Sequence, residues 1–461
     1  YATLPKDDPK VYDMLCNADT VGVFQVESRG QMSMLPRLRP RCFYDLVVEI
    51  ALVRPGPIVG QMVHPYLRRR DGLEPIRYPH PCLVPALERT LGIPIFQEQL
   101  LKIAVSIAGF TGGEAEELRR AMGFKSPAKK MTRLIDKLKI GMNRNGIAEE
   151  IQDEVVENIQ SFAHYGFPES HSASFALIAY ASAYLKAHHP AAFLCALLNA
   201  QPMGFYHPAT LVKDAQRHGV RVMPIDITKS DYCCTLEDAQ TVRLGLSYVN
   251  GLSSASAQRI LRAREQHGLN DARELRDIIS LSQSEWATLS ELGAFAALGL
   301  TRRQALWQLS KAQHQSPLFP RNKSSNAPAP IPEMSLVDRV DADYRNASLS
   351  VGPHPMHFMR AKLRAQGILS SAEVPHQANG GSVMVAGLVT VRQRPMTAKG
   401  ILFVTLEDEW GFINLIVSPE LFEKSRPVAV GAAGMVAQGT VQNHRGITHI
   451  KCRQIESLTV I

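Results

Sequence analysis

One segment of the chain lacks the composition of a folded core. Between Gln313 and Met334 the sequence reads QHQSPLFPRNKSSNAPAPIPEM, which is dominated by Pro, Ser, Asn and Ala. Such a composition cannot bury enough apolar surface to offset the conformational entropy that is lost on ordering. We therefore expect a linker here, with separately folded parts on either side. A length of 461 residues, of which 45% are hydrophobic, suits about three domains.

The part of the chain before this linker has mostly helical periodicity. Up to about residue 200, long periodic stretches are broken by Pro and Gly at VRPGP, YPHPC and FTGG. This pattern predicts one large α-rich domain over residues 1–200. Residues 201–312 begin with short apolar runs typical of strands. They continue into VNGLSSASAQRILRARE, where a turn leads into an amphipathic helix, and then into a second helical pair.

The C-terminal part alternates apolar and polar residues with the period of a β-strand. Five such runs follow Gly381, and one short helical piece, SPELFEKS, lies between the third and the fourth. Five strands with a helix in this place are the pattern of an OB-type β-barrel. The expected fold class is therefore multidomain α+β. Its last two parts are a linker and connecting segment over 313–378 and a barrel over 379–461.

Composition and charge exclude several classes of protein. The seven cysteines form no Cys-x-x-Cys pair and no regular spacing, so neither a zinc site nor a disulfide framework is indicated, and a reducing cytoplasm fits best. The most apolar segment, Ala173 to Leu185, is shorter than the roughly 20 residues that a bilayer requires, so we expect no membrane span. The chain begins with YATLPKDDPK, without an initiator methionine or a signal peptide, and we expect a piece of a longer protein.

The net charge of +8 is moderate, but basic residues cluster between residues 119 and 144, where Asp136 is the one acid. The nine basic residues are Arg119, Arg120, Lys125, Lys129, Lys130, Arg133, Lys137, Lys139 and Arg144. On a helix Lys129, Arg133 and Lys137 would share one face. Met131, Ile135, Leu138 and Met142 would form an apolar stripe on another. One side is expected to pack, while the other meets either a polyanion or solvent.

Two further stretches allow a nucleic-acid interpretation beside a structural one. In VNGLSSASAQRIL, Gly251 permits a tight turn between helices, and the backbone N–H groups of Leu252 and Ser253 would be open to a DNA phosphate. The same turn can be a plain packing corner.

The second stretch is the barrel, where three aromatic residues alternate with three basic ones, which suits stacking on single-stranded bases. They are Phe403, Trp410 and Phe412, and Arg392, Arg394 and Lys399. Small barrels also fill their interiors with aromatic side chains, so both interpretations stand.

The stretch GFPESHSASFALIAY places Ser170 and His171 directly before an apolar helix. A nucleophile with its base is disfavoured. Adjacent residues at a helix start point about 100° apart, and no third residue is placed to orient the histidine. Ser170 is instead expected to be the N-cap of the helix. The same helix start can hold an anion, with His171 as a further donor.

Several long motifs, in order and in register, carry a resemblance that covers nearly the whole chain. They are GVFQVESRGQM, EIALVRPGPIVGQMV, YLRRRDG, IFQEQLLKIAVSIAGFTGGEAEELRRAMGFK and GFPESHSASFALIAYASAYLKAHHPAAF. They resemble the fingers region of bacterial C-family DNA polymerases, the relatives of the DNA polymerase III alpha subunit. The following segments look like the helix-hairpin-helix module and the OB domain of that family. Four features look like its error-prone, damage-inducible branch: PESH, NAQPMGFYHPATLVKDAQRHGV, RRQALW and TLEDEWGFINLIV.

The resemblance implies template-directed transfer of a nucleotide from dNTP to a primer 3′-OH, with Mg²⁺ held by three aspartates of the palm. Those aspartates precede GVFQVES in the family, so they are expected before Tyr1, and no catalytic or metal-binding residue is expected in this chain. Asp341 and Asp343 are interpreted as part of a solvated turn. Family positions in or near the nucleotide site match Arg54, Arg119, Arg120, Lys125, Ser170 and His171. Replicative relatives have a lysine where this chain has Glu169, so these cations would carry the hold on the triphosphate.

The resemblance also implies contacts with a DNA primer-template. The expected DNA-binding residues are Lys129, Lys130, Arg133, Gly251, Ser253, Arg259, Arg392, Arg394 and Trp410. In the linker, Gln315, Leu318 and Phe319 resemble the pentapeptide that bacterial proteins insert into the sliding clamp. A Y-family-like mutagenesis partner is a further expectation. Two alternatives remain open at this stage, a replicative alpha subunit and a non-catalytic DNA-binding accessory protein.

Overall fold

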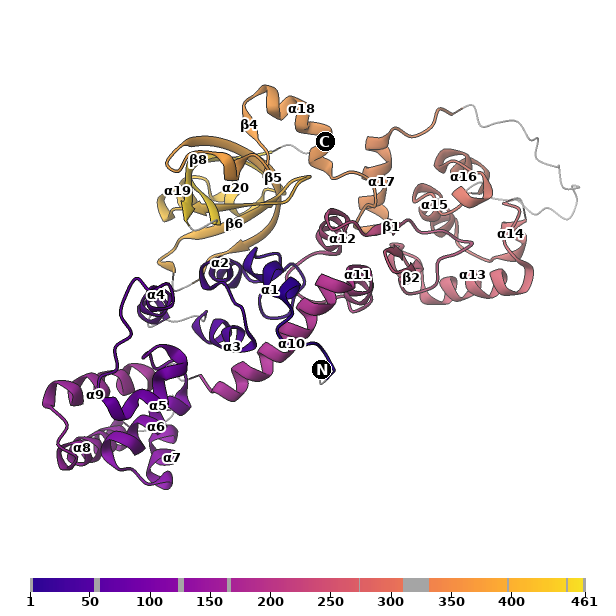
Figure 1. Cartoon of the computed structure of the whole chain (residues 1–461). Coiled ribbons are helices and arrows are strands. Elements are labelled where there is room, and N and C mark those ends of the chain that lie inside the picture. The colour runs from indigo at the N-terminus through magenta and orange to yellow at the C-terminus, as the bar shows by residue number, and fades with distance from the viewer. Residues whose placement is uncertain are drawn as a thin grey trace, which may run out of the picture. The chain divides into compact units, whose positions relative to one another are not determined.

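The computed structural model describes residues 3–53, 59–122, 128–163, 167–272, 274–309, 331–395, 398–444 and 447–458. The chain forms two compact units (Figure 1). Unit 1 comprises residues 1–187 with 395–399, and unit 2 comprises residues 188–394 with 400–461. Among the described residues, none of the helices combines the length and the apolar character that a membrane crossing requires.

Unit 1 is helical, as the periodicity predicts. Its elements are α1 (Pro9–Cys16), α2 (Arg29–Leu38), α3 (Phe43–Leu52), α4 (Val59–Arg70), η1 (Pro81–Leu83), α5 (Val84–Leu87), η2 (Glu88–Thr90), α6 (Gln97–Ala108), α7 (Gly112–Ala121), α8 (Ala128–Arg144), α9 (Glu149–Ala163) and α10 (Glu169–His188). Thr111 and Glu114 form a capping box at the start of α7, which satisfies amide groups that the helix itself cannot use.

The helices from η1 to α9 share one hydrophobic core. On α8 the side chains of Ile135, Leu138 and Met142 are buried in it and Met131 packs against it, so the predicted apolar stripe is confirmed. Gly141 lets α8 approach α6 closely, because a Cβ atom there would lie 2.1 Å from the carbonyl oxygen of Ala108. The opposite face of α8 is thereby turned to solvent.

Unit 2 begins with helices and a small sheet and ends in a barrel. Its helical elements are α11 (Pro190–Asn199), α12 (Pro208–Arg217), η3 (Leu246–Tyr248), α13 (Ser254–His267), α14 (Leu275–Ile278), α15 (Gln283–Glu291), η4 (Ala296–Leu298), α16 (Arg302–Leu309), α17 (Leu336–Ala347), α18 (Pro355–Ala365), η5 (Val374–His376), α19 (Pro419–Lys424) and α20 (Arg426–Gly431). Its strands are β1 (Arg221–Met223), β2 (Thr235–Asp238), β3 (Thr241–Arg243), β4 (Ile368–Leu369), β5 (Ser382–Gln393), β6 (Leu402–Glu407), β7 (Phe412–Val417), β8 (Gly434–His444) and β9 (Ile447–Ser457).

The five predicted C-terminal strands close into a barrel, which confirms the expected fold class. The barrel strands follow the order β5-β6-β7-β9-β8, with the short β4 added in parallel to β5. β8 pairs back onto β5 from Ser382↔Thr440 to Leu388↔Gly434. The long strand β5 closes the barrel because its first half pairs with β8 and its second half with β6. The predicted helix after the third strand is α19, and α20 follows it directly.

A buried carboxylate joins α12 to the barrel. Glu407, at the end of β6, accepts a hydrogen bond of 2.8 Å from the Thr210 hydroxyl and one of 3.1 Å from Arg217. Burial raises the pKa of the Glu407 carboxyl to about 7, although Arg217 and Thr210 act in the opposite direction. Lys213 and Tyr344 interact with the same carboxyl through their charges.

The raised pKa of Glu407 predicts a stability that depends on pH. The protonated form is favoured in the folded chain, so this contribution is complete below the ordinary pKa of 4.5 and is lost as the pH rises through about 7. Relative to Glu407→Gln, wild type should therefore lose up to about 3 kcal/mol of unfolding free energy between pH 5 and pH 8. Urea denaturation of both proteins measures this, with the exposed Glu456→Gln as the control. Parallel pH profiles for wild type and Glu407→Gln would contradict the prediction.

Candidate functional site

The start of α10 is capped by a distant carboxylate and not by Ser170. The helix begins at Glu169, whose amide donates to Oε2 of Glu98 at 2.9 Å, and the Ser172 amide donates to the Pro168 carbonyl at 3.2 Å. Ser170 lies inside the first turn. The prediction that Ser170 is the N-cap is therefore wrong, because α6 supplies the acceptor from across the fold.

Ser170 and His171 both lie exposed at this helix start. The His171 ring packs against two phenylalanine rings, and no hydrogen bond to its ring nitrogens is formed within the described part of the chain. Without a carboxylate to orient the imidazole, the pair lacks the arrangement of a nucleophile with its base. A hydrolase site is not supported here.

Glu169 does not stand as a free negative charge beside Ser170. Its Oε1 accepts a hydrogen bond of 3.0 Å from the Tyr44 hydroxyl and lies 3.5 Å from Nη1 of Arg89. The Arg89 guanidinium lies over the Tyr44 ring, 3.7 Å from its centroid. The Arg89 side chain is 67% exposed, so a cation that the sequence did not single out lies at the start of α10.

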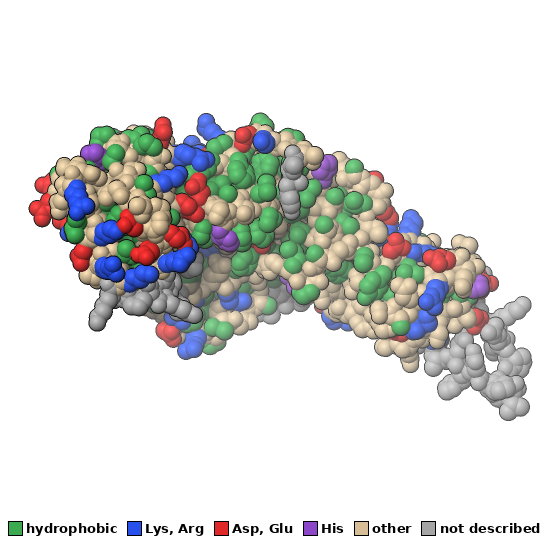
Figure 2. All heavy atoms as spheres, turned by 90° about the horizontal axis from the view of Figure 1, so that it is seen from below, with side chains coloured by type: hydrophobic (Ala, Val, Ile, Leu, Met, Phe, Trp, Pro, Cys, Tyr) green, Lys and Arg blue, Asp and Glu red, His purple; other side chains and the backbone are tan. Residues whose placement is uncertain are grey.

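The basic cluster is partly neutralised by acids of α7 and α9. Arg119 and Arg120 bind Glu116 at 2.7 and 3.1 Å. These two hydrogen bonds lower the pKa of Glu116 to about 2. Lys137 pairs with Glu114, and Lys139 lies 2.8 Å from Asp153. At the left end of Figure 2, which holds α7–α9, basic and acidic side chains are accordingly interspersed.

Two further cations of the cluster are exposed on α8. Lys130 and Arg133 are exposed on α8, away from its buried stripe. Lys129 belongs to the same helix, but its side chain lies outside the described residues, as do Arg54 and Lys125 entirely. The structure thus brings Arg119, Arg120, Lys130 and Arg133 to one helical subdomain without joining them into a single pocket.

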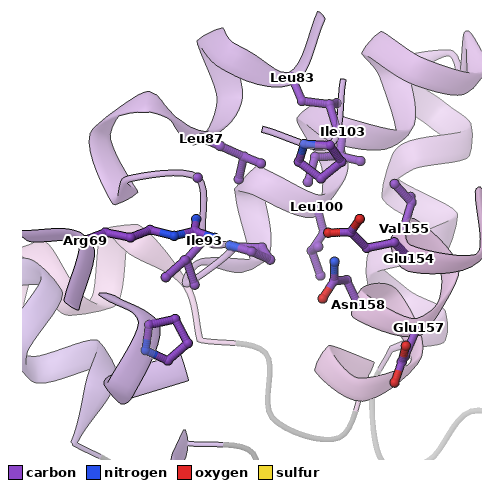
Figure 3. A pocket seen from close by; sticks show the side chains of 14 residues that line it. Arg69, Leu83, Leu87, Ile93, Leu100, Ile103, Glu154, Val155, Glu157 and Asn158 are labelled. Atoms are coloured by element: carbon purple, nitrogen blue, oxygen red, sulfur yellow. The ribbon is translucent and has the colours of Figure 1, made fainter. Parts of the chain in front are cut away.

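A pocket of about 290 Å³ opens in this subdomain between the η1–η2 segment, α6 and α9 (Figure 3). Its floor is formed by apolar side chains such as Leu100 and Ile103, and Glu154 and Glu157 of α9 lie at its side. Among the described residues of its lining, Arg69 is the one that is basic. Nη1 of Arg69 donates to the Leu91 carbonyl at 2.7 Å. The pocket therefore lacks the array of cations that a triphosphate requires.

The turn at Gly251 is more occupied than the sequence indicates. Gly251 has a φ of +79°, as a tight turn needs. However, the Leu252 amide donates to Val249 at 3.2 Å, and the Ser253 amide donates to the Glu285 carboxylate at 3.4 Å. The expectation that both amides are open to a phosphate is wrong. Glu285, 32 residues further along, supplies an anion of its own.

The basic residues of α13 differ in their hydrogen-bond partners. Arg259 donates to the Ser280 carbonyl and to the Ser256 hydroxyl, both at 2.7 Å. Ser253 uses its hydroxyl to accept the Ser256 amide as the N-cap of α13. Arg262 is exposed, and within the described residues its guanidinium has no partner. Arg262 is therefore the residue of this helix best placed to meet a DNA phosphate, and no local pattern distinguished it.

The barrel separates the aromatic and basic residues that alternate in the sequence. Trp410 is 62% exposed at the tip between β6 and β7. Arg392 donates to the carbonyls of Ala429 and Ala432, and Arg394 lies over the Phe422 ring, 4.1 Å from its centroid. Arg392 pairs with Val404 in the half of β6 that lies away from Trp410, and Arg394 directly follows the end of β5. The arginines therefore have partners of their own in the barrel and do not flank Trp410 as the sequence order suggests.

Phe412 of the barrel packs against α12 and the segment before it. The ring centroid of Phe412 lies 6.1 Å from that of Tyr206 and 5.2 Å from the Arg217 guanidinium. Phe412 therefore helps to join α12 to the barrel and does not offer a free stacking surface.

Asp341 and Asp343 do not form a metal site, because they pair with different arginines. Asp341 and Asp343 lie in α17, so the prediction of a solvated turn is wrong. Asp343 is buried, 2.7 Å from Arg302, because α17 packs against the helical module here. Within neither unit do the described His, Cys, Asp and Glu residues bring three ligand atoms together. The proposed clamp-binding residues Gln315, Leu318 and Phe319 lie outside the described residues.

Comparisons with known proteins agree with this organisation. Residues 1–146 match the family described as the bacterial DNA polymerase III alpha subunit finger domain, and residues 219–305 match a helix-hairpin-helix motif. An asparaginyl-tRNA synthetase structure from Pyrococcus horikoshii is 19% identical over 20% of this chain and 23% of that one. Its TM-score of 0.18 is too low to support an argument.

Relatives extend over the whole chain. An error-prone DNA polymerase of Methylococcus capsulatus is 46% identical over 99% of this chain and 46% of its own length. One from Anaeromyxobacter dehalogenans is 46% identical over 100% of this chain and 42% of its own length. One from Pseudomonas fluorescens is 44% identical over 99% of this chain and 46% of its own length. The chain thus spans less than half the length of these relatives. Its first 146 residues match the finger-domain family of the bacterial DNA polymerase III alpha subunit, and the whole chain is similar to error-prone DNA polymerases.

Proposed function

We propose that this chain is the nucleotide-binding and DNA-binding part of an error-prone, damage-inducible DNA polymerase. The observation that carries the proposal is the similarity to error-prone polymerases along the entire chain, from the helical unit through the hairpin module to the barrel. We assign residues 1–200 to the fingers, 201–312 to the hairpin module, 313–378 to the linker and connecting segment, and 379–461 to the OB domain.

In the proposed reaction a primer 3′-OH attacks the α-phosphate of dNTP, and pyrophosphate leaves. Nucleotidyl transfer uses two divalent ions, which we propose are Mg²⁺. We propose that carboxylates of the palm hold these ions, as the family resemblance implies. The part played by this chain is to bind and orient the triphosphate and the DNA. Arginine suits the first task because its planar donors match phosphate oxygens.

Arg120 is expected to act on the nucleotide. Its side chain is 70% exposed and, among the described residues, pairs with Glu116, which is itself exposed, so it can turn to a phosphate without breaking a buried contact. Arg120→Ala in the complete gene product should raise the KM for dNTP about 10- to 100-fold, the loss expected for a charged hydrogen bond. DNA affinity should change much less.

Steady-state kinetics and DNA titration measure the two quantities, with the exposed Arg339→Ala as the control. Equal effects of Arg120→Ala on dNTP and on DNA would remove the triphosphate assignment.

DNA binding by the isolated chain should be dominated by phosphate contacts. Filter binding is expected to give a slope of log Kobs against log salt of about −3 to −6, with little sequence preference. Alanine at Lys130, Arg133 or Arg262 should each reduce the slope by about one. The proposal for these faces fails if the slope is flat or if the variants retain the wild-type slope.

We also propose two binding partners and assign the chain to the error-prone branch. The linker residues Gln315, Leu318 and Phe319 are proposed to bind the sliding clamp, and a Y-family-like mutagenesis protein is a second proposed partner, both in the cytoplasm. The similarity to error-prone relatives favours this branch over a replicative alpha subunit. A polymerase assay of the complete gene product separates this proposal from a non-catalytic accessory protein, which would show no polymerase activity.

A further inference from the structure

An aromatic ladder lies along the exposed side of the start of α10. His171 and Phe175 lie four residues apart on one face of α10, and Phe167 precedes the helix by two residues. The His171 ring centroid lies 5.1 Å from that of Phe167, with the planes at 71°, and 4.2 Å from that of Phe175, with the planes at 45°. Phe24 extends the ladder, 5.3 Å from Phe175.

The ladder holds the His171 ring by packing and not through its nitrogens. Phe167 and Phe175 are half-buried, whereas His171 is exposed. Within the described part of the chain, neither ring nitrogen of His171 takes part in a hydrogen bond, and neither does the Ser170 hydroxyl. Edge-to-face and tilted packing restricts the rotation of a ring without using its polar atoms. Nδ1 and Nε2 thus remain available to a ligand while the ring orientation is set.

The backbone beneath the ladder is fixed from two sides. The Gln97 amide donates to the Phe167 carbonyl at 3.0 Å, and Glu98 caps Glu169. On the inner side of α10 the Ser172 hydroxyl donates to the Val47 carbonyl in α3. The ladder therefore stands on a rigid base, as a preorganised binding group requires.

We propose that Phe167 and Phe175 are positioning residues, which orient the imidazole of His171 so that its N–H donates to a phosphate oxygen of the incoming nucleotide. This inference rests on the proposed function, in which the nucleotide binds at the start of α10. Because the ring is already ordered before binding, the nucleotide does not have to restrict it. Loss of the ladder frees the ring and weakens nucleotide binding, while the groups that carry out the transfer are untouched.

The test uses kinetics of the complete gene product. His171→Ala should raise the KM for dNTP about tenfold, and Phe175→Leu about three- to tenfold, with kcat changed less than KM in both. Phe175→Tyr keeps an aromatic ring at this position and should therefore show the wild-type KM for dNTP. Leu185→Ala, at an exposed position on the same helix outside the ladder, should leave both constants unchanged. If Phe175→Leu does not fold, Phe167→Leu provides the same comparison.

A double mutant separates positioning from a structural role. When Phe175→Leu is added to His171→Ala, the KM should not rise further, because the residue that it orients is gone. A further rise, or a failure of Phe175→Tyr to restore the KM, would overturn the inference. If His171→Ala itself leaves the KM unchanged, the proposed nucleotide site at the start of α10 is wrong. If His171→Ala raises the KM but Phe175→Leu does not, only the positioning role fails.

Discussion

Asp408→Ala is expected to lower the unfolding free energy of the barrel by about 3–5 kcal/mol, the loss typical of a broken buried ion pair. Asp408 is fully buried at the tip between β6 and β7. Its carboxylate accepts the amides of Trp410, Gly411 and Ser371 at 2.9, 3.1 and 2.7 Å. It also lies 3.2 Å from Arg360. Removing it leaves three amides and a largely buried guanidinium without this acceptor.

Chemical denaturation followed by circular dichroism measures the loss, and hydrogen exchange at Trp410 and Gly411 locates it. Asp408→Asn keeps one acceptor oxygen but loses the other and the charge, so its loss should be smaller than that of Asp408→Ala. Asp341→Ala removes a carboxylate that is 58% exposed and pairs with Arg345 on one helix, and it should cost less than about 0.5 kcal/mol. A loss below about 1 kcal/mol for Asp408→Ala would show that the tip does not depend on this carboxylate.

Gly141→Ala is expected to destabilise unit 1 by about 1–3 kcal/mol and to displace α8. The added Cβ would lie 2.1 Å from the carbonyl oxygen and 2.9 Å from the carbonyl carbon of Ala108, so backbone must move. Alanine would otherwise favour a helix by about 1 kcal/mol, and the clash is expected to outweigh this gain. Because α8 carries Lys130 and Arg133, DNA affinity should fall together with stability.

Gly113→Ala is the matched control in unit 1. Gly113 lies in the first turn of α7, and no atom lies within 4 Å of a Cβ placed there. This change should be neutral or stabilise by up to about 1 kcal/mol. Thermal unfolding and DNA titration of the two variants compare an equal chemical change at a crowded and an open position. Equal behaviour would contradict the close approach of α8 to α6.

Features that depend on neighbouring residues were predictable. Alternation over the last eighty residues predicted five strands and a helix after the third, and the barrel closes in that arrangement. The apolar spacing of Leu138 and Met142 predicted which side of α8 packs. These predictions succeed because strand and helix periods are local properties of the chain, and burial of one face follows from them.

The partners of charged and polar groups were not predictable in the same way. Glu98 caps α10 from 71 positions away, Glu285 occupies the hairpin amide of Ser253 from 32 positions away, and Arg89 neutralises Glu169 from a third segment. The sequence by itself determined the elements, the barrel and the family resemblance. Only the tertiary structure decided which charges of the candidate site remain open to a ligand, because that depends on which distant carboxylates and carbonyls the packing brings within hydrogen-bond distance.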